Sequence, residues 1–255
     1  MDKNINAAPK PRAEVIRPQI TRLPELTFFR RVYRIFFIRL IGLAVRSLVR
    51  IRVRGLENVP RRGPALIVAN HLGDADALVL QTYIPIVVEF IAKAELYDYP
   101  ILGKFADTYG VIWLHRGQPD RRAIRAALEG LRQGRVVVIN PEARESLTGA
   151  LEEGTGGAAY LALKAGVPVL PITFTGTENN RVYANLKRLR RTDITLTIGP
   201  AFRLEQLPDR QEAIDKGTQK IMEALAAQLP LDYRGVYSRQ DESRPGAMQS
   251  HAAEE

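Results

Sequence analysis

The chain has 255 residues, of which 45% are hydrophobic and 25% are charged, the composition of a globular protein. It contains no cysteine, which excludes disulfides, thiolate metal sites and cysteine nucleophiles. The net charge of +9 lies at one end, because residues 1–54 hold 13 Lys and Arg against 3 Asp and Glu. A nucleic-acid-binding domain more often spreads its positive charge over a folded face, so we expect no nucleic-acid partner.

The basic N-terminal part divides into two segments. Residues 1–25 carry scattered prolines and are predicted to form a loose arm. Residues 26–50, "LTFFRRVYRIFFIRLIGLAVRSLVR", predict a basic amphipathic helix. Arginines interrupt it too often for a membrane-spanning helix, so we expect it to lie in the membrane interface, with its arginines on anionic head groups. The alternative is a helix that packs on its own domain and leaves a solvated basic side.

The membrane-interface helix predicts a peripheral or monotopic membrane protein. The sequence shows no secretory signal peptide, so we expect the cytoplasmic face of the membrane. Membrane lipids are therefore expected partners.

Short β-rich runs alternate with helical patterns through residues 51–238, which we expect to form one domain. The predicted strands are 65–70, 86–92, 111–114, 135–140, 167–174 and 193–199, and the predicted helices include 119–134, 156–166 and 209–229. This order predicts a single α/β domain with a mixed, mostly parallel sheet covered by helices. In such sheets the chemistry gathers at the carboxyl ends of the strands. Residues 239–255 are predicted to be a disordered tail.

The stretch "VANHLGDADAL", residues 68–78, places His71 at the end of a predicted strand and Asp76 five residues later. A turn between them would bring the carboxylate onto one imidazole nitrogen, which fixes the tautomer and leaves the other nitrogen free as a general base. The alternative is that Asp74 or Asp76 only caps the next helix, with His71 as a polar loop residue.

Other kinds of chemistry have weaker support in the sequence. The chain has five serines, none in a G-x-S-x-G turn, and Ser146 is the candidate nucleophile within the folded body. Three scattered histidines do not supply a metal shell, so we expect no metal. "EGTGGAA" contains G-x-G-x-x-A at 154–159, but the polar stretch before it is no strand, so a dinucleotide site is rejected. These glycines are expected to let a loop approach the start of a helix closely.

Two further predicted strands end in polar clusters, "GVIWLHRG" (110–117) and "VINPEARES" (138–146). Arg116, Glu142 and Arg144 would meet near His71 if these strands are neighbours. The planar fork of an arginine can donate two hydrogen bonds to a phosphate, so the cluster is a candidate anion site. The alternative is a set of strand-end residues that face solvent.

Taken together and in this order, these stretches resemble the glycerolipid acyltransferase family, that of the 1-acyl-sn-glycerol-3-phosphate acyltransferases and other lysophospholipid acyltransferases. Its first block, N-H-x4-D, matches Asn70, His71 and Asp76. The second block of the family, a strand followed by D-R-G, matches "GVIWLHRG". The third block, F-P-E-G-T-R-S, is similar to "NPEARES". The fourth block, an apolar strand around a proline, matches "VPVLPITF" (167–174). The segment "AKAEL" (92–96) is also similar. The resemblance covers about residues 50–200.

The resemblance implies a glycerol-3-phosphate acyltransferase-like fold and transfer of a fatty acyl group to a lipid hydroxyl. The donor would be acyl-CoA or acyl carrier protein, with no further cofactor. The acceptor would be a lysophospholipid, first of all 1-acylglycerol-3-phosphate; glycerol-3-phosphate, a non-phosphate lipid and a catalytically silent lipid-binding protein are the alternatives. By this resemblance the general base is His71, oriented by Asp76, and the substrate-binding residues are Asn70, Arg116, Gly117, Glu142 and Arg144.

The chain departs from the family blocks at five positions. His115 stands where the second block has an acid. In the third block Asn140 replaces Phe, Ala143 replaces Gly, and Glu145 occupies the arginine position, with Arg144 one residue early. The catalytic pair is intact, so activity is expected, while the acceptor pocket is altered.

Overall fold

The computed structural model describes residues 17–117 and 120–240. Its helices are α1 Phe28–Leu48, α2 Ala75–Tyr83, α3 Leu102–Tyr109, α4 Arg121–Arg132, α5 Gly157–Ala165, α6 Asn179–Lys187 and α7 Arg210–Ala226. Its strands are β1 Val49–Arg54, β2 Ala65–Ala69, β3 Val88–Lys93, β4 Ile112–Leu114, β5 Val136–Ile139, β6 Val169–Thr175 and β7 Thr192–Ile198. Short 3-10 segments include Ala94–Asp98 after β3.

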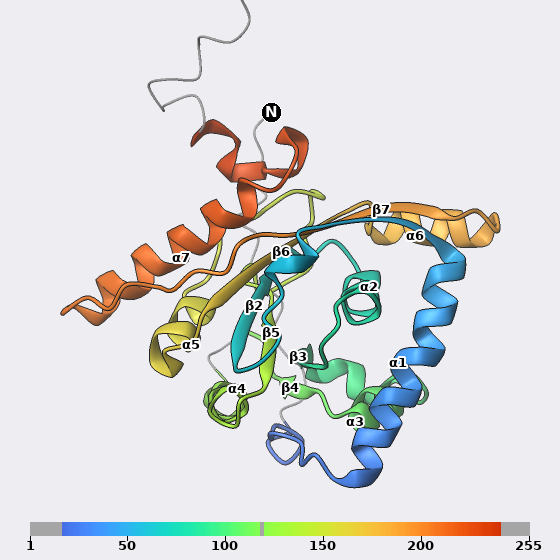
Figure 1. Ribbon diagram of the computed structural model, residues 1–255, viewed down its shortest axis with the longest axis horizontal. Coiled ribbons are helices and arrows are strands. Elements are labelled where there is room, and N and C mark those ends of the chain that lie inside the picture. Colours follow the sequence, from blue (N-terminus) through green and yellow to red (C-terminus); the bar gives the residue numbers. More distant parts are fainter. Residues whose placement is uncertain (1–16, 118–119, 241–255) are drawn as a thin grey trace, which may run out of the picture.

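The strands form one seven-stranded sheet in the order β1-β7-β6-β2-β5-β3-β4. Every neighbouring pair is parallel except β6 and β7, which run antiparallel. The prediction of a single α/β domain with a mixed, mostly parallel sheet is confirmed. Because β2, β3, β5 and β6 run the same way, the loops that follow them gather at one edge of the sheet (Figure 1).

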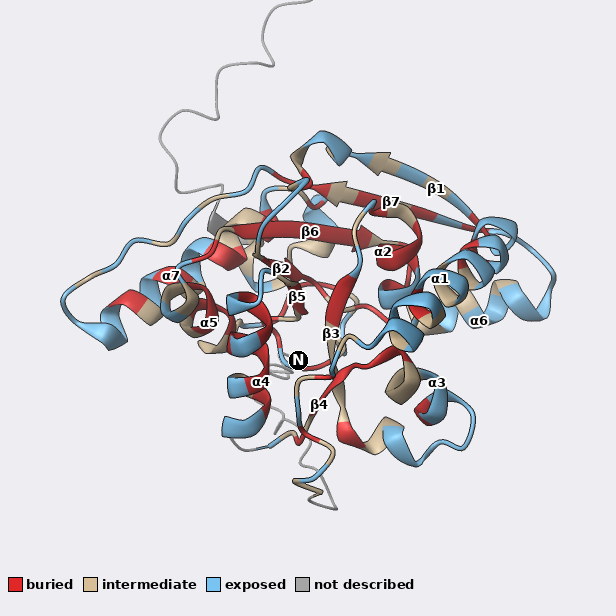
Figure 2. Cartoon of the chain, turned by 60° about the horizontal axis from the view of Figure 1, so that its bottom comes forward, coloured by how far each residue is buried: buried red, intermediate tan, exposed pale blue. Residues whose placement is uncertain are grey.

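Helices cover both faces of the sheet, as its uniformly apolar central strands require. All five residues of β2 are buried, and they alternate between two cores. Leu66 and Val68 face the core under α4, α5 and α7, while Ala65, Ile67 and Ala69 face the core shared with α1 and α2. Figure 2 shows the buried residues along the central strands and the sheet-facing sides of these helices.

Helix α1 packs on the body through a buried arginine. Arg34 is 3% exposed, and its guanidinium donates two hydrogen bonds, of 2.8 and 2.7 Å, to the two carboxylate oxygens of Glu89. Removing one partner of such a buried pair typically costs about 3–5 kcal/mol. The expectation that the arginines of this segment lie on lipid head groups is therefore wrong for Arg34. The outward side of α1 is instead mostly apolar.

The structure also differs from the predicted boundaries of the N-terminal part. The helix begins at Phe28 and ends at Leu48, because Val49 and Arg50 already belong to β1. Residues 17–25, part of the expected loose arm, pack on the body: Thr21 is buried and the backbone N–H of Arg17 donates to His115. The rest of that arm and residues 241–255 of the expected tail lie outside the described residues.

Candidate active site

The predicted site residues lie where parallel strands end. Asn70 and His71 follow β2, the loop 140–146 follows β5, and His115 to Gly117 follow β4. Asn70 joins two strands, because its side-chain amide donates to the carbonyl oxygen of Phe174 in β6 at 3.0 Å and accepts from the N–H of Phe174 at 2.8 Å. It is 2% exposed. The side chain of Asn70 therefore fixes the backbone just before His71 to β6, and it is not available to a substrate.

His71 and Asp76 meet across the turn between β2 and α2. The Nδ1 atom of His71 lies 2.9 Å from the Oδ2 atom of Asp76, which also accepts the N–H groups of Leu72 and Gly73. The carboxylate oxygen of Asp76 accepts these hydrogen bonds, so in the neutral form of the imidazole the proton lies on Nδ1 and Nε2 carries the lone pair. Within the described residues Nε2 has no hydrogen-bond partner, and the side chain is 30% exposed.

The surroundings of His71 favour its charged form. Burial of the ring lowers its pKa, but the hydrogen bond to Asp76 and the negative charges of Asp76, Glu145 and Glu142 outweigh burial and raise the pKa of His71 above its ordinary value. An imidazole in this setting can take a proton and be stabilised once charged, which is the electrostatic requirement for a general base.

The loop 140–146, which carries the third sequence block, contacts both the backbone N–H and the carbonyl oxygen of His71. Glu142 accepts its N–H at 3.2 Å through one oxygen and the N–H of Glu152 at 2.8 Å through the other. Burial raises the pKa of Glu142 to about 7. The N–H of Ser146 donates to the carbonyl oxygen of His71 at 2.8 Å, while its hydroxyl donates to Ala150. Glu142 thus holds the loop against the histidine, and the Ser146 hydroxyl is turned to its own loop.

Arg144 lies in a buried ion pair, not at the open side of the site. Its side chain is 5% exposed and its Nε lies 2.5 Å from a carboxylate oxygen of Glu152. The expectation that Arg144 binds the acceptor's phosphate is therefore not supported by its position. Glu145, the next residue, contributes its charge to the surroundings of His71 instead.

Arg116 and Gly117 follow β4. Arg116 is partly buried and lies 3.8 Å from Glu95. Its Nε atom is buried and has no hydrogen-bond partner among the described residues. Gly117 has a φ of +92°, a backbone conformation that favours glycine. Arg116 thus has a buried nitrogen without a partner among the described residues, at the end of a strand that lies three strands from β2 in the sheet order.

The sequence reasoning missed a polar group at the start of α6. Asn179 donates to Glu145 at 2.8 Å and accepts the N–H of Asp74 at 2.9 Å. The hydroxyl of Tyr183 donates to the carboxylate of Asp74 at 2.7 Å. Asn179 and Tyr183 lie in the segment that follows β6, so the strand-end rule that located His71 would also have located them.

His115 repeats the spacing of the first pair, with Asp120 five residues later. Its Nδ1 lies 3.0 Å from Asp120, and its Nε2 accepts the N–H of Arg17 at 2.8 Å. Both nitrogens are occupied and the residue is 4% exposed. This pair ties the N-terminal segment to the loop before α4 and has no free base.

Comparisons with known proteins identify the family of the chain. A protein-family model described as Acyltransferase matches residues 50–175. A lyso-ornithine lipid O-acyltransferase of Pseudomonas aeruginosa is 30% identical over 190 residues, which cover 69% of this chain and 72% of the relative. The chain belongs to this acyltransferase family. The family expected from the four sequence blocks is thereby confirmed.

Two further similarities extend this picture. A chloroplastic 1-acyl-sn-glycerol-3-phosphate acyltransferase of Arabidopsis thaliana is 32% identical over 153 residues, covering 58% of this chain and 43% of the relative. The chain thus spans less than half the length of that relative. The crystal structure of the acyltransferase PlsC from Thermotoga maritima matches with a TM-score of 0.60 at 23% identity, covering 80% of this chain and 84% of that chain, which shows a shared fold.

Proposed function

We propose that the protein transfers a fatty acyl group from a thioester donor to the free hydroxyl of a lysolipid. The observation that carries this proposal is the His71–Asp76 pair, 2.9 Å apart, with a free Nε2 at the carboxyl edge of the sheet. Family membership and the names of the relatives support the reaction class.

The proposed chemistry is direct transfer with His71 as general base. Nε2 takes the proton of the acceptor hydroxyl as that oxygen attacks the thioester carbonyl carbon. The carbon–sulfur bond then breaks, and the imidazolium returns the proton to the leaving sulfur. Asp76 holds the ring and stabilises the imidazolium between the two steps. General base catalysis of this kind contributes about 10²- to 10⁴-fold.

The acceptor proposed first is 1-acylglycerol-3-phosphate, which the name of the Arabidopsis relative contains. Arg116 would hold its phosphate, with Lys93 at the end of β3 as a further cation whose charge acts on Glu145.

A second acceptor is proposed because of the carboxylates beside His71. The charge of Glu145 acts on His71, and that of Asp74 acts in turn on Glu145, so the two carboxylates would oppose a phosphate monoester while attracting an ammonium group. Ornithine carries such a group, and the relative from Pseudomonas aeruginosa is named for a lyso-ornithine lipid.

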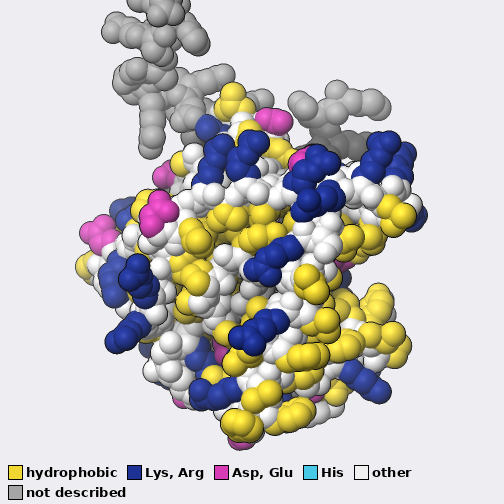
Figure 3. All heavy atoms as spheres, turned by 45° about the vertical axis from the view of Figure 1, so that its right-hand side comes forward, with side chains coloured by type: hydrophobic (Ala, Val, Ile, Leu, Met, Phe, Trp, Pro, Cys, Tyr) yellow, Lys and Arg dark blue, Asp and Glu magenta, His cyan; other side chains and the backbone are white. Residues whose placement is uncertain are grey.

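Membrane association is proposed from α1. Its outward side chains include Phe28, Phe29, Phe36 and Leu43, between 63% and 84% exposed. Figure 3 shows hydrophobic and basic side chains gathered on the face that comes forward. No helix in the described part of the chain is long and apolar enough to cross a membrane. The cytoplasmic face stays a prediction.

The acceptor test compares two lysolipids with different head groups, presented in vesicles, with the water-soluble acceptor glycerol-3-phosphate. Acyl transfer from acyl-CoA and from acyl carrier protein is measured to lysophosphatidic acid, lyso-ornithine lipid and glycerol-3-phosphate. We expect transfer to at least one of the two lysolipids, and Glu145→Arg should shift the preference toward the phosphate-bearing one. Transfer to neither lysolipid from either donor would contradict the proposed function.

A further inference from the structure

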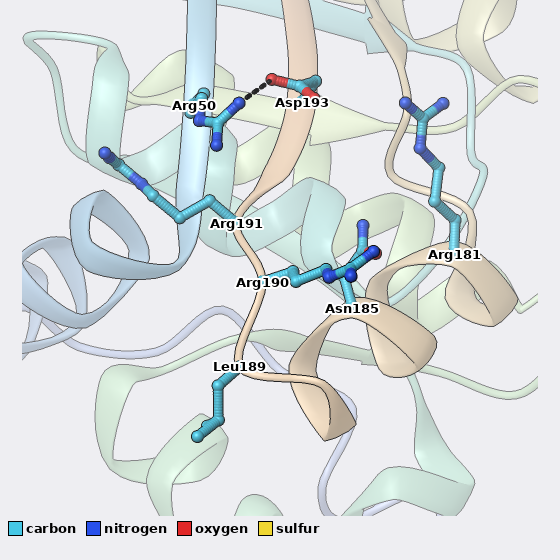
Figure 4. Close-up of a pocket in the computed structure, with 7 residues that line it drawn as sticks. All are labelled: Arg50, Arg181, Asn185, Leu189, Arg190, Arg191 and Asp193. Atoms are coloured by element: carbon cyan, nitrogen blue, oxygen red, sulfur yellow. Dashed lines mark ion pairs between the residues drawn. The ribbon is translucent and has the colours of Figure 1, made fainter.

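A basic hollow of about 650 Å³ lies beyond α6, away from His71. It is lined by Arg50, Arg181, Asn185, Leu189, Arg190, Arg191 and Asp193 (Figure 4). Four of these seven residues are arginines and one is acidic, so the hollow is suited to an anionic ligand.

The topology places this hollow on the same edge of the sheet as His71. Because β7 runs antiparallel to β6 and β1 runs parallel to β7, the first residues of β1 and β7 lie beside the last residues of β6. The order β2-β6-β7-β1 with roughly 4.8 Å between neighbours puts Arg50 and Asp193 about 10–15 Å along the edge from the strand that ends before His71. Helix α6 spans the same gap, from Asn179 beside Glu145 to Asn185 in the hollow.

Three of the four arginines that line the hollow make no close side-chain hydrogen bond or ion pair with another residue of the described chain. Arg191 is structural, because it donates to the carbonyl oxygens of Arg46 and Val49 where α1 meets β1. Arg50 lies 3.7 Å from Asp193, and both side chains are about two-thirds exposed. In the described part of the chain, no ion pair involves the guanidinium of Arg181 or Arg190; Figure 4 shows Arg190 alongside Asn185 and Arg181 extending from the same helix.

The turn that carries Arg190 is tightly held. The N–H of Arg190 donates to the carbonyl oxygen of Asn185 at 2.9 Å, and Leu189 has a φ of +51°, an uncommon conformation for a side chain of this kind. Strained residues of this type persist where the surrounding structure holds them and cluster at ligand sites. The turn thereby presents Arg190 beside α6.

The distance between His71 and the hollow indicates whether the hollow would bind the phosphate of the acceptor or the phosphates of the acyl donor. The head group of a lysolipid acceptor is only a few bonds from its reacting hydroxyl, so its phosphate stays close to that hydroxyl. A thioester on coenzyme A is separated from the first phosphate by the pantetheine arm, which is roughly 15 Å long when extended, from ordinary bond lengths. We propose that Arg50, Arg181 and Arg190 bind the phosphate groups of a coenzyme A thioester donor. This inference rests on the proposed function only in taking a thioester as the donor.

Equilibrium binding of free coenzyme A tests the site without any turnover. Calorimetry would compare the wild-type protein with Arg190→Glu, Arg181→Glu/Arg190→Glu and the control Arg132→Glu, an exposed arginine of α4. We expect Kd to rise about tenfold in the single variant, more in the double variant, and to be unchanged in the control, because each phosphate loses a charge-assisted partner. His71→Ala should bind coenzyme A like the wild type. Equal Kd values for the wild type and the double variant would overturn the proposal.

Two further arms separate other sources of negative charge. Pantetheine, which has no phosphate, should bind equally to the wild type and the double variant. Loss of binding to phosphatidylglycerol vesicles, or to holo acyl carrier protein, with coenzyme A binding intact, would assign the hollow to a membrane or a carrier protein and overturn the proposal. Arginine-dependent coenzyme A binding without acyl transfer to any acceptor would contradict the proposed function alone.

Discussion

Two histidines of the described chain stand five residues before an aspartate, and their surroundings separate them. His71 keeps a free Nε2 on a side chain that is 30% exposed, whereas His115 is buried with both nitrogens hydrogen-bonded. The sequence pattern is the same at both positions. Only the packing of residues 17–25 against His115, which no local pattern predicts, makes that second pair structural.

At the same scale, Glu145 tunes the base. Its negative charge is one cause of the raised pKa of His71, so Glu145→Gln should lower that pKa. The base is active when deprotonated, and the acid limb of the pH profile of kcat/KM should therefore move to lower pH. Glu129→Gln, at an exposed position of α4, is the matched control. An unmoved acid limb in Glu145→Gln would show that this limb does not report His71.

At the scale of elements, six strands were predicted within two residues at each end, because apolar runs identify buried strands well. The first strand, β1, was missed: "VRIRVR" alternates arginines with aliphatic residues at the sheet edge, and it follows α1 without a break. Helix α6, "NNRVYANLK", was also missed: it is a short, mostly polar segment, and none of its residues is buried.

The candidate site was predictable in part for a similar physical reason. The strand-end rule located His71, Asp76 and Glu142, but the partner of Arg144 depends on where the chain carries Glu152. The glycines at 154–156 were expected to let a loop approach the start of a helix, and in the structure they lie against α7: an added Cβ at Gly154 would lie 2.6 Å from Met222, and one at Gly156 would lie 2.7 Å from Ile214.

The loop after β5 contains a strained residue. Ala143 has a φ of +59°, in the left-handed region, and its side chain is exposed. A left-handed conformation costs a non-glycine residue about 1–2 kcal/mol, and the gain from glycine is smaller by the entropy of the unfolded chain. Ala143→Gly should therefore raise the free energy of unfolding by about 0.5–1 kcal/mol, measured by urea denaturation. A less stable variant would contradict this account of the loop.

At the scale of the whole molecule, α1 packs on the protein with one side and exposes apolar side chains on the other. Arg34 fixes it to Glu89 inside, and rings of Phe37 and Phe105, 5.7 Å apart, join it to α3. The neighbouring segment 97–105 adds exposed Tyr99 and Ile101 to the outward apolar side chains of α1. The apolar face is therefore wider than the helix predicted from the sequence.

Membrane binding by this face is tested with substitutions that leave the packed side intact. Phe28→Ser, Phe36→Ser and Leu43→Ser combined should reduce co-sedimentation with phosphatidylglycerol vesicles at least tenfold, because each exposed side chain loses part of about 1.5–3 kcal/mol of burial. Leu231→Ser, at another exposed leucine, is the control. Removal of residues 1–50 would be a poorer test, since it also removes Arg34 and the start of β1. Undiminished vesicle binding by the triple variant would place the membrane contact elsewhere.

The most direct test of the whole account is acyl transfer from acyl-CoA to a lysolipid in vesicles by the wild type and His71→Ala. The ring of His71 is partly exposed, so the variant should keep its fold, checked by circular dichroism and thermal unfolding. We predict that kcat falls at least a hundredfold, because the acceptor hydroxyl loses its general base. A folded variant with activity within a few fold of the wild type would contradict the role of His71 and, with it, the mechanism proposed for this protein.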